Sequence, residues 1–422
     1  MFYANKKSDL NDLLVDTWWY ALSKRISEND FRQLAMLRTR QGFSAVQLVV
    51  GIPPEIGPEN ENAASEVGIA WNLMGKFNED YLRFAHNRIK FLNELGLTVI
   101  VYGAWGYQID WIGKEKMARW WKLIVDKMDK LNIIYCVTGE IDLWVGKEKM
   151  LFLNKTTKDL IANKVVKSIH ARVSLTFLKK VRSFCKRVCV SVGVKSQLSL
   201  IQKRKDDWGF VLKDLASKTK KPIIIHPTEK TGRDSVSNSE LLSANTVQTG
   251  HSQESRRRIW NWLMETMERS DFFINLEPWY EGIMNDFGKE DQLFAYWSSM
   301  LAGASSFCYG AHGIWNVGDG NFLSHWGGQT FEQAIALDTP RLIGLSHWQF
   351  LKVKNKLQTS FFSERNGRLI YIARKGHSEE VFFFPEISAA DLVPNGHVWL
   401  PLLGVFSDDL PQKGQVVIFR TL

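Results

Sequence analysis

The sequence predicts an α/β fold, a (β/α)8 TIM barrel followed by a small C-terminal antiparallel β-sandwich domain. Apolar runs of strand length alternate with helical stretches, and eight such runs fall within about 330 residues, the size of a barrel with insertions. Beyond about Leu345 the pattern changes to short β-type runs separated by Gly, Pro and Asn turns. We therefore expect a barrel at residues 1–340 and a β-sandwich at residues 345–422.

The expected barrel strands are short and apolar, as strands buried on both faces of a parallel sheet should be. In chain order they are Leu13–Tyr20, Ala45–Gly51, Leu97–Gly103, Ile133–Thr138, Pro222–His226, Thr246–His251, Phe272–Glu277 and Ser305–Tyr309. Helices are expected between them at about Ser27–Arg40, Glu79–Leu95, Glu115–Leu131, Ser255–Glu268 and Lys289–Leu301. In the terminal domain the expected strands are Leu369–Ala373, Glu380–Phe384, His397–Leu400 and Gln415–Arg420.

One crossover is much longer than its neighbours and rich in lysine. Residues 147–221 hold 20 Lys and Arg against 5 Asp and Glu, an excess that more than accounts for the net charge of +9 of the whole chain. We expect a basic insertion at about 143–220 on the outer surface of the barrel. Because no recognised nucleic-acid motif accompanies the charge, a solvated basic surface is favoured over a nucleic-acid partner.

The sequence contains no motif for a metal, a nucleotide or a membrane span. The four cysteines show no CxxC spacing, there is no HExxH or phosphate loop, and we expect no metal and no cofactor. No stretch reaches the roughly twenty apolar residues of a membrane span, and the first residues lack the apolar core of a signal peptide. We expect a cytoplasmic protein without a membrane partner.

Two glutamates follow predicted strands where barrel enzymes carry their catalytic groups. Glu140 follows the fourth strand, and Glu277 ends the seventh, where Pro278 stops regular pairing. A closed barrel projects both carboxyls into one mouth, which suits glycoside hydrolysis: one protonates the leaving oxygen and the other attacks the anomeric carbon or activates water. Either alone would be an ordinary strand-end acid, but the pair, each close to Trp, favours catalysis. Asp142 and Glu281 are the local alternatives.

Aromatic and polar side chains gather in the loops after the strands, where they would line a sugar-binding cleft. Indole faces stack on the CH faces of sugar rings, although core packing explains each single Trp equally well. The histidines are expected to hydrogen-bond substrate rather than bind metal. The expected substrate-binding residues are Asp16, Trp18, Trp19, Trp105, Tyr107, Trp111, His226, His251, Trp279, Tyr280, Glu281, Trp315 and Asn316. Several of Trp18, Trp105, Trp279 and Trp315 should share one pocket with both glutamates.

A family resemblance rests on motifs that occur in order between about residues 12 and 335. They are DTWWY (16–20), VQLVVGIPPE (46–55), GAWGYQIDW (103–111), TGE (138–140), TGHS (249–252), EPWYEGI (277–283) and YGAHGIWN (309–316). Together they resemble the apiosidase-like glycoside hydrolases. The resemblance implies a retaining barrel hydrolase with its acid/base at Glu140 and its nucleophile at Glu277. It also implies a β-sandwich tail likened to a collagen-binding domain, and a leading segment that is missing or trimmed here.

We therefore expect a glycosidase that cleaves a glycosidic bond in a plant-type or bacterial oligosaccharide by a two-carboxylate retaining mechanism. The carboxyls should then lie about 5 to 5.5 Å apart, and the charge of Glu277 with the nearby indoles should raise the pKa of Glu140. One alternative is a non-catalytic carbohydrate-binding protein on an inactive barrel, and another is an interaction scaffold built around the basic segment.

Overall fold

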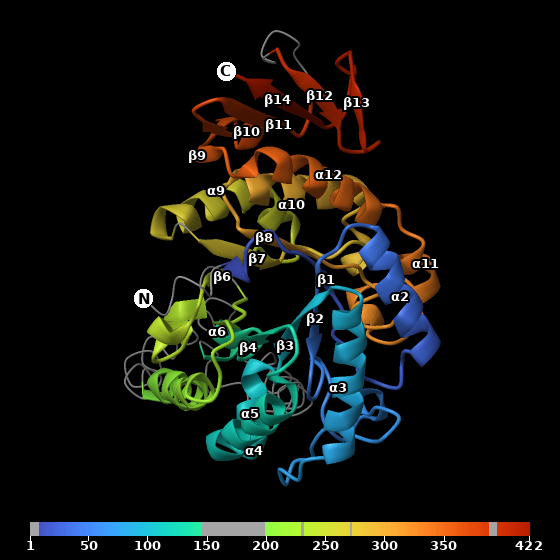
Figure 1. Ribbon diagram of the computed structural model, residues 1–422, viewed down its shortest axis with the longest axis vertical. Helices are drawn as coiled ribbons and strands as arrows, with labels where there is room; N and C mark the ends of the chain where they lie inside the picture. The colour runs from blue at the N-terminus through green and yellow to red at the C-terminus, as the bar shows by residue number, and fades with distance from the viewer. Residues whose placement is uncertain (1–7, 146–198, 229–231, 271, 388–394) are drawn as a thin grey trace, which may run out of the picture.

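Eight parallel strands form a nearly closed barrel in the computed structural model, which describes residues 8–145, 199–228, 232–270, 272–387 and 395–422 (Figure 1). Their order around the barrel is β5-β4-β3-β2-β1-β8-β7-β6. The strands are β1 (Leu14–Thr17), β2 (Ala45–Val49), β3 (Thr98–Tyr102), β4 (Ile133–Cys136), β5 (Ile223–Ile224), β6 (Asn245–Gln248), β7 (Phe273–Glu277) and β8 (Ser306–Tyr309). They overlap the eight predicted runs, so the predicted barrel is confirmed.

Strands β5 and β6 stand at the two ends of this order, and hydrogen bonds beside them join the ends. The Ser243 N–H donates to the Ile223 carbonyl at 2.8 Å, and the Ile223 N–H donates to Ser243 Oγ at 3.0 Å. The Thr246 hydroxyl also donates to the carbonyl of Ile225. These bonds satisfy backbone groups that an open sheet edge would leave unpaired.

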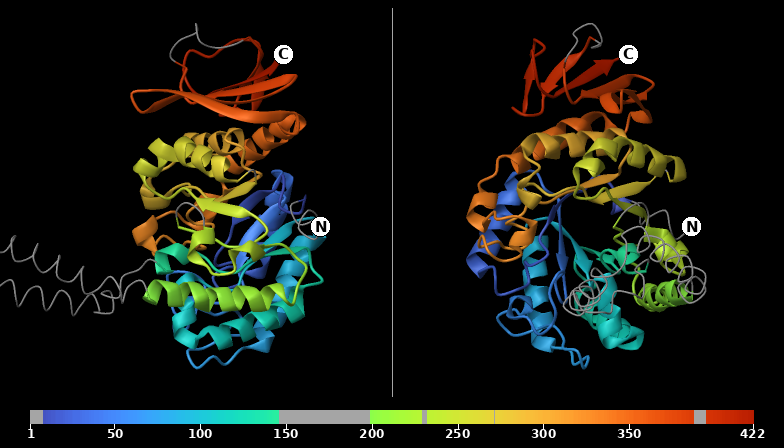
Figure 2. Two further views of the ribbon diagram at one scale, coloured as in Figure 1. Left: turned by 90° about the vertical axis from the view of Figure 1, so that its left-hand side faces the viewer. Right: turned by 180° about the vertical axis from the view of Figure 1, so that it is seen from behind.

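Helices cover the outside of the barrel strands (Figure 2). The helix residues buried against the barrel are mostly apolar. The α-helices are α2 (Glu28–Arg40), α3 (Glu79–Glu94), α4 (Ile109–Ile112), α5 (Lys114–Met128), α6 (Ile141–Val145), α9 (Gln253–Arg269), α10 (Lys289–Leu301), α11 (Phe331–Ile335) and α12 (Thr339–Lys354). Short 3-10 helices lie at η1 (Glu61–Ala63), η2 (Gly106–Gln108), η4 (Gly232–Ser235), η5 (Ser239–Leu241), η6 (Ile283–Asn285) and η7 (Ser324–Trp326). The five predicted helices are confirmed. Within the described ranges, none of the helices is long and apolar enough to cross a membrane.

Capping side chains fix where the longer helices begin. Ser27 accepts a hydrogen bond from the Asp30 N–H at the start of α2, and Ser252 does the same for Ser255 in α9. Each cap satisfies one of the amide groups that the first turn of a helix leaves without an intrahelical partner.

The predicted basic insertion at about 143–220 lies partly outside the described residues, which do not include 146–198. Residues 199–216 form a helix, in which Trp208, Val211, Leu212 and Leu215 are buried. Trp208 donates its indole N–H to the Gly106 carbonyl at 3.0 Å. This part of the predicted insertion therefore packs on the barrel, and the boundaries of the insertion stay a prediction.

The C-terminal strands form one six-stranded antiparallel sheet, in the order β13-β12-β14-β11-β10-β9. They are β9 (Leu357–Arg365), β10 (Arg368–Gly376), β11 (Glu379–Phe384), β12 (His397–Leu400), β13 (Val405–Ser407) and β14 (Val416–Thr421). The predicted antiparallel region is confirmed, with β9 and β13 as strands that were not predicted. The sheet lies on α10 and α12 at the top of Figure 1. Helix α12 runs through the predicted boundary between residues 340 and 345.

Aromatic packing joins this sheet to the barrel. Phe383 of β11 lies with its ring centroid 6.1 Å from that of Phe294 and 6.4 Å from that of Trp297, both in α10. Trp399 of β12 donates its indole N–H to Ser346 Oγ of α12 at 3.3 Å. The buried apolar residues of the barrel and of this face of the sheet form one continuous cluster.

Candidate active site

A pocket opens at the carboxyl ends of the barrel strands and contains both predicted catalytic glutamates. It holds about 390 Å³ of empty space, open solvent at its mouth included. The lining residues are Trp19, Pro54, Glu55, Trp105, Glu140, His251, Glu277, Tyr280, Ile283, Trp315 and Trp326. The loops after β1, β2, β3, β4, β6, β7 and β8 thus meet at one place, as expected where parallel strands end together.

Glu140 follows β4 on a sharply turned backbone. Its φ of 46° lies in the left-handed region, which costs a non-glycine residue roughly 1–3 kcal/mol. Gly139 lets the Trp105 ring pack against the main chain, because a Cβ there would lie 2.6 Å from that ring. The Gly106 N–H donates to the Gly139 carbonyl at 2.8 Å, and the Gly139 N–H donates to the Ala104 carbonyl at 3.0 Å. Held in this way, the Trp105 indole N–H reaches Glu140 Oε2 at 3.0 Å.

Burial and charge make the Glu140 carboxyl an unusually weak acid. Loss of solvent raises its pKa, the negative charge of Glu277 raises it further, and the Trp105 hydrogen bond opposes both, leaving a pKa of about 7. The direction is the one the sequence predicted. The indole acts in the opposite sense to the expectation, because its N–H donates to the carboxylate and stabilises the charged form.

Glu277 ends β7 and faces two histidines and an amide. His251 Nε2 lies 2.8 Å from Glu277 Oε1 in hydrogen-bonding geometry, and Gln248 Nε2 donates to the same oxygen at 3.4 Å. His226 Nε2 lies 3.2 Å from Oε2 but outside hydrogen-bonding geometry. Glu277 therefore has directed donors on one oxygen and an electrostatic neighbour on the other.

The histidines keep Glu277 acidic in spite of its burial. Loss of solvent alone would raise the pKa of Glu277, but the hydrogen bond from His251 and the charges of His226 and His251 bring it below its ordinary value. Burial lowers the pKa of His226, and the hydrogen bond from His251 is the largest of the contributions that lower the pKa of Glu277. The pKa values of the two glutamates are thus shifted in opposite directions, upward for Glu140 and downward for Glu277.

Aromatic side chains form the walls around the two carboxyls. Trp19 donates its indole N–H to the Tyr280 hydroxyl at 2.9 Å and meets the Trp105 ring edge-on, with 5.1 Å between centroids. The ring of Trp315 lies 5.9 Å from that of Tyr280, also between centroids. Of the four tryptophans expected to share the pocket, Trp105 and Trp315 line it with both glutamates.

The other two tryptophans of that prediction lie in the core, so their placement in the cleft is wrong. Trp18 is buried edge-on against Phe31 of α2 and donates its indole N–H to Asp16 Oδ2 at 2.7 Å. The same carboxylate oxygen accepts from Arg38 Nε at 2.6 Å, so Asp16 is also directed away from the pocket. Trp279 is buried and donates to the Asp291 carbonyl at 3.2 Å. These residues therefore hold α2 and α10 against the barrel.

Glu281 and Asn316 also serve the structure rather than the pocket. Glu281 is buried and accepts from the Tyr309 hydroxyl at 2.6 Å and from the Thr339 hydroxyl at 2.7 Å. Asn316 accepts from the Gly313 N–H at 2.8 Å and donates to a neighbouring loop carbonyl. Both were predicted to bind substrate, but their polar atoms are occupied by protein partners.

The remaining predicted residues lie behind the pocket wall. His226 is buried under the rings of Trp19 and Trp105, with ring centroids 6.2 Å from each. Tyr107 packs edge-on against Trp111, with centroids 5.2 Å apart, and neither lines the pocket. Asp142, an alternative to Glu140, accepts a hydrogen bond from the Thr228 N–H and does not line the pocket.

Pro54, Glu55, Ile283 and Trp326 line the pocket but were not predicted as site residues. Pro54 and Glu55 lie in the long loop after β2, whose length and IPPE sequence were available as a signal. Trp326 ends the 3-10 helix η7, and no strand precedes it closely enough to mark it.

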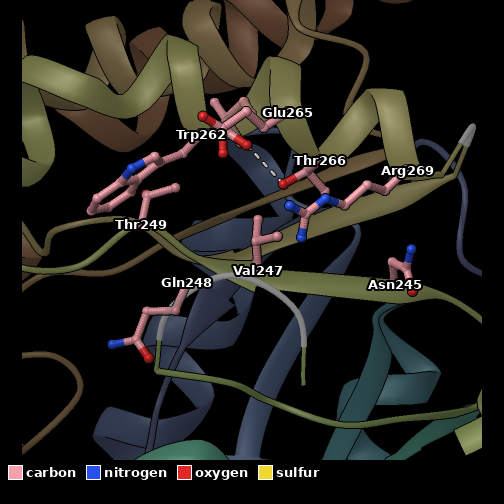
Figure 3. A pocket seen from close by; sticks show the side chains of 9 residues that line it. Asn245, Val247, Gln248, Thr249, Trp262, Glu265, Thr266 and Arg269 are labelled. Atoms are coloured by element: carbon pink, nitrogen blue, oxygen red, sulfur yellow. Dashed lines mark hydrogen bonds between the residues drawn. The ribbon is translucent and has the colours of Figure 1, made fainter. Parts of the chain in front are cut away.

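A second pocket lies between β6 and α9, outside the barrel (Figure 3). Val247 points from β6 toward Thr266 and Arg269 of α9, whereas Gln248 points to the other side of the strand (Figure 3). There Gln248 Nε2 donates to Glu277 Oε1. Glu265 is the only carboxylate among the residues that line this pocket. This second pocket therefore offers no pair of carboxylates.

Residues 13–338 match the family model described as Apiosidase-like, catalytic domain. The chain belongs to this family. The apiosidase-like assignment confirms the resemblance carried by the motifs and makes the protein a glycosidase rather than an inactive carbohydrate-binding barrel. No curated protein matches the sequence. Within the described ranges, no group of three or more His, Cys, Asp or Glu is arranged to hold a metal ion.

Solved structures share the fold of this apiosidase-like protein at low sequence identity. A glycoside hydrolase of family 5 from Bacteroides vulgatus ATCC 8482 is 13% identical with a TM-score of 0.64, covering 96% of this chain and 88% of its own. A protein described as a glycoside hydrolase is also 13% identical, with a TM-score of 0.63 and coverage of 96% and 92%. At these identities the likeness establishes the fold.

Proposed function

We propose that this glycosidase cleaves a glycosidic bond in a plant-type or bacterial oligosaccharide with retention of configuration. In this proposal Glu140 is the acid/base and Glu277 the nucleophile. The observation that carries it is the opposite displacement of two pKa values within one pocket, to about 7 for Glu140 and below the ordinary value for Glu277. A retaining hydrolase needs one carboxyl that keeps its proton beside one that has lost it.

The proposed reaction has two displacements. Glu140 gives its proton to the leaving oxygen while a Glu277 oxygen attacks the anomeric carbon, so the glycosidic C–O bond breaks and a glycosyl ester forms. Glu140, now ionised, takes a proton from water as the water oxygen displaces Glu277, which restores both carboxyls. Two inversions at the anomeric carbon give net retention. For this mechanism we still expect the two carboxyl groups to lie about 5 to 5.5 Å apart.

A panel of aryl glycosides, followed by proton NMR of the first-formed anomer, tests the mechanism. The expected product has the configuration of the substrate, and an inverted product would contradict the proposed pair. Glu277→Ala should lose nearly all activity and regain part of it with added azide, which replaces the missing nucleophile.

Glu140→Ala should retain activity best on substrates whose leaving group needs no proton. Asp142→Asn and Glu281→Gln are matched controls, because they change the neighbouring carboxylates that lie outside the pocket. If Asp142→Asn abolished turnover while Glu140→Ala did not, the acid/base assignment would be wrong.

A further inference from the structure

Glu55 is a third carboxylate in the catalytic pocket, and the proposed mechanism does not use it. The Glu140 carboxylate is held by Trp105 and that of Glu277 by His251. In the described part of the chain, the Glu55 carboxylate accepts no hydrogen bond, and His325 Nε2 lies 3.8 Å from Glu55 Oε2. The Glu55 side chain is 38% exposed at the pocket wall. Its oxygens are therefore available to a ligand.

The loop after β2 holds Glu55 in this place. Glu55 has a φ of 71°, a left-handed conformation that costs a non-glycine residue roughly 1–3 kcal/mol and persists only where the surroundings enforce it. The Tyr20 hydroxyl donates to the carbonyl of Pro54, immediately before Glu55. Closer to β2 on the same loop, Gln108 Nε2 donates to the Ile52 carbonyl at 3.0 Å. The backbone on the strand side of Glu55 is thus anchored to two neighbouring loops.

The ionisable residues that line the pocket are mostly acidic. Its lining contains three carboxylates, Glu55, Glu140 and Glu277, and a single basic side chain, His251, with no Lys or Arg among the lining residues. Because Glu140 keeps its proton as the acid, an anionic sugar would bring a further negative charge beside the carboxylates of Glu55 and Glu277, and no Lys or Arg lines the pocket to match it. Like charges at short range in a partly desolvated site disfavour binding, so the lining selects against acidic sugars.

An ionised carboxylate is an acceptor-only group with two oxygens, and neighbouring sugar hydroxyls offer it two donors. We propose that Glu55 is a specificity residue that accepts hydrogen bonds from two adjacent hydroxyls of a neutral sugar and turns away sugars that carry a carboxylate. This inference rests on the proposed function, since it concerns the sugar bound between Glu140 and Glu277.

Pairs of substrates, one neutral and one carrying a carboxylate on the same sugar, test this proposal. The panel contains 4-nitrophenyl glucosides with glucuronides and galactosides with galacturonides, in both anomers, together with xylosides, arabinosides and amino sugars. For the wild type we expect kcat/KM on the best neutral substrate to exceed that on any uronide by at least a hundredfold. Glu55→Gln, which removes the charge and keeps the shape, should lower kcat/KM on that neutral substrate about tenfold or more, mainly through KM, and narrow the discrimination against uronides.

Glu59→Gln is the matched control, because Glu59 is exposed on the same loop, carries the same charge and does not line the pocket. It should behave as the wild type. A preference of the wild type for a uronide or an amino sugar, or unchanged KM and selectivity in Glu55→Gln, would overturn the proposal. If Glu277→Gln still turned over substrate, the proposed function would be overturned. The comparison of Glu55→Gln with the wild type would then still test the role of Glu55.

If no panel member is turned over, fluorescence of the pocket tryptophans gives a second reading without catalysis. Titration with the free neutral sugars should change the emission in the wild type and in Glu59→Gln, and more weakly in Glu55→Gln. Stronger binding of glucuronate or galacturonate than of their neutral partners would overturn the proposal, as would the absence of any response to neutral sugars.

Discussion

Glu140 places opposite demands on folding and on catalysis. Its pKa of about 7 in the folded protein exceeds the ordinary value of 4.5, so the folded state favours the neutral carboxyl. A raised carboxyl pKa stabilises the fold fully below the unfolded pKa, and this contribution is lost as the pH rises through the folded pKa. Above pH 7 the protein therefore carries a charge that the surrounding structure disfavours.

Glu140→Gln should accordingly be more stable than the wild type at pH 8, by on the order of 2 kcal/mol, and equal to it near pH 4. Urea unfolding at the two pH values measures this difference. Glu59→Gln, with an exposed side chain, should show no comparable gain. A Glu140→Gln protein no more stable than the wild type at pH 8 would mean that Glu140 is ionised at little cost.

The pH–rate profile should report the same two carboxyls. The basic limb of kcat/KM should fall near pH 7, because Glu140 must keep its proton to give it to the leaving group. The acidic limb reflects protonation of Glu277, whose pKa is held down chiefly by the hydrogen bond from His251. His251→Ala should raise the pKa of Glu277 and so move the acidic limb of the profile to higher pH. The pH range of high kcat/KM should then become narrower. His251→Gln can still donate to Glu277, so its shift should be smaller, and an acidic limb unmoved in both variants would remove His251 from this role.

At the scale of single elements, the joint between β4 and α6 sets the position of the acid. Gly139→Ala would bring a Cβ to 2.6 Å from the Trp105 ring, so the indole that bonds Glu140 must shift. We expect a loss of 1–3 kcal/mol in stability, as overpacking typically costs, and a fall of at least tenfold in kcat. Gly57→Ala is the control, because a Cβ there meets no atom within 4 Å. Equal kcat values for the two variants would show that Glu140 does not depend on the Trp105 contact.

Strand periodicity explains which predicted residues after β1 line the pocket. Alternate residues of a strand face opposite sides, so Thr17 and Trp19 face the barrel interior and the pocket, whereas Asp16 and Trp18 face Arg38 and Phe31 of α2. After β7 the period does not apply, because the strand ends at Glu277: Glu277 lines the pocket, whereas Trp279, two residues later, is buried and donates to the Asp291 carbonyl of α10. The sequence motifs located the strand ends, but neighbouring residues such as Trp18 and Trp19 were both assigned to the cleft. Applying the two-residue period would have removed Asp16 and Trp18.

At the scale of the whole molecule, the barrel could be predicted because its strands are buried on both faces and their apolar runs are easily recognised. Strand β9 was missed because, apart from Leu357, its residues are exposed or only partly buried, and β13 because it is only three residues long with exposed Val405 and Phe406. Trp326 comes from a loop whose path depends on tertiary contacts, and no local pattern in the sequence places it in the pocket. Glu55 lies in the long loop after β2, whose length and IPPE sequence pointed to a functional loop but not to this one side chain.

The continuous core predicts that the barrel and the C-terminal sheet unfold together. Phe383 is fully buried between the sheet and α10, so Phe383→Ala should cost about 3–5 kcal/mol. Phe382, the next residue on the same strand, packs on the outer face of the sheet against Tyr371 and Phe384 and is half-buried, so Phe382→Ala should cost less. Calorimetry of Phe383→Ala should show a single transition at lower temperature, with glycosidase activity lost in step. Two separated transitions, or activity that survives the first, would show that the sheet is an independent domain.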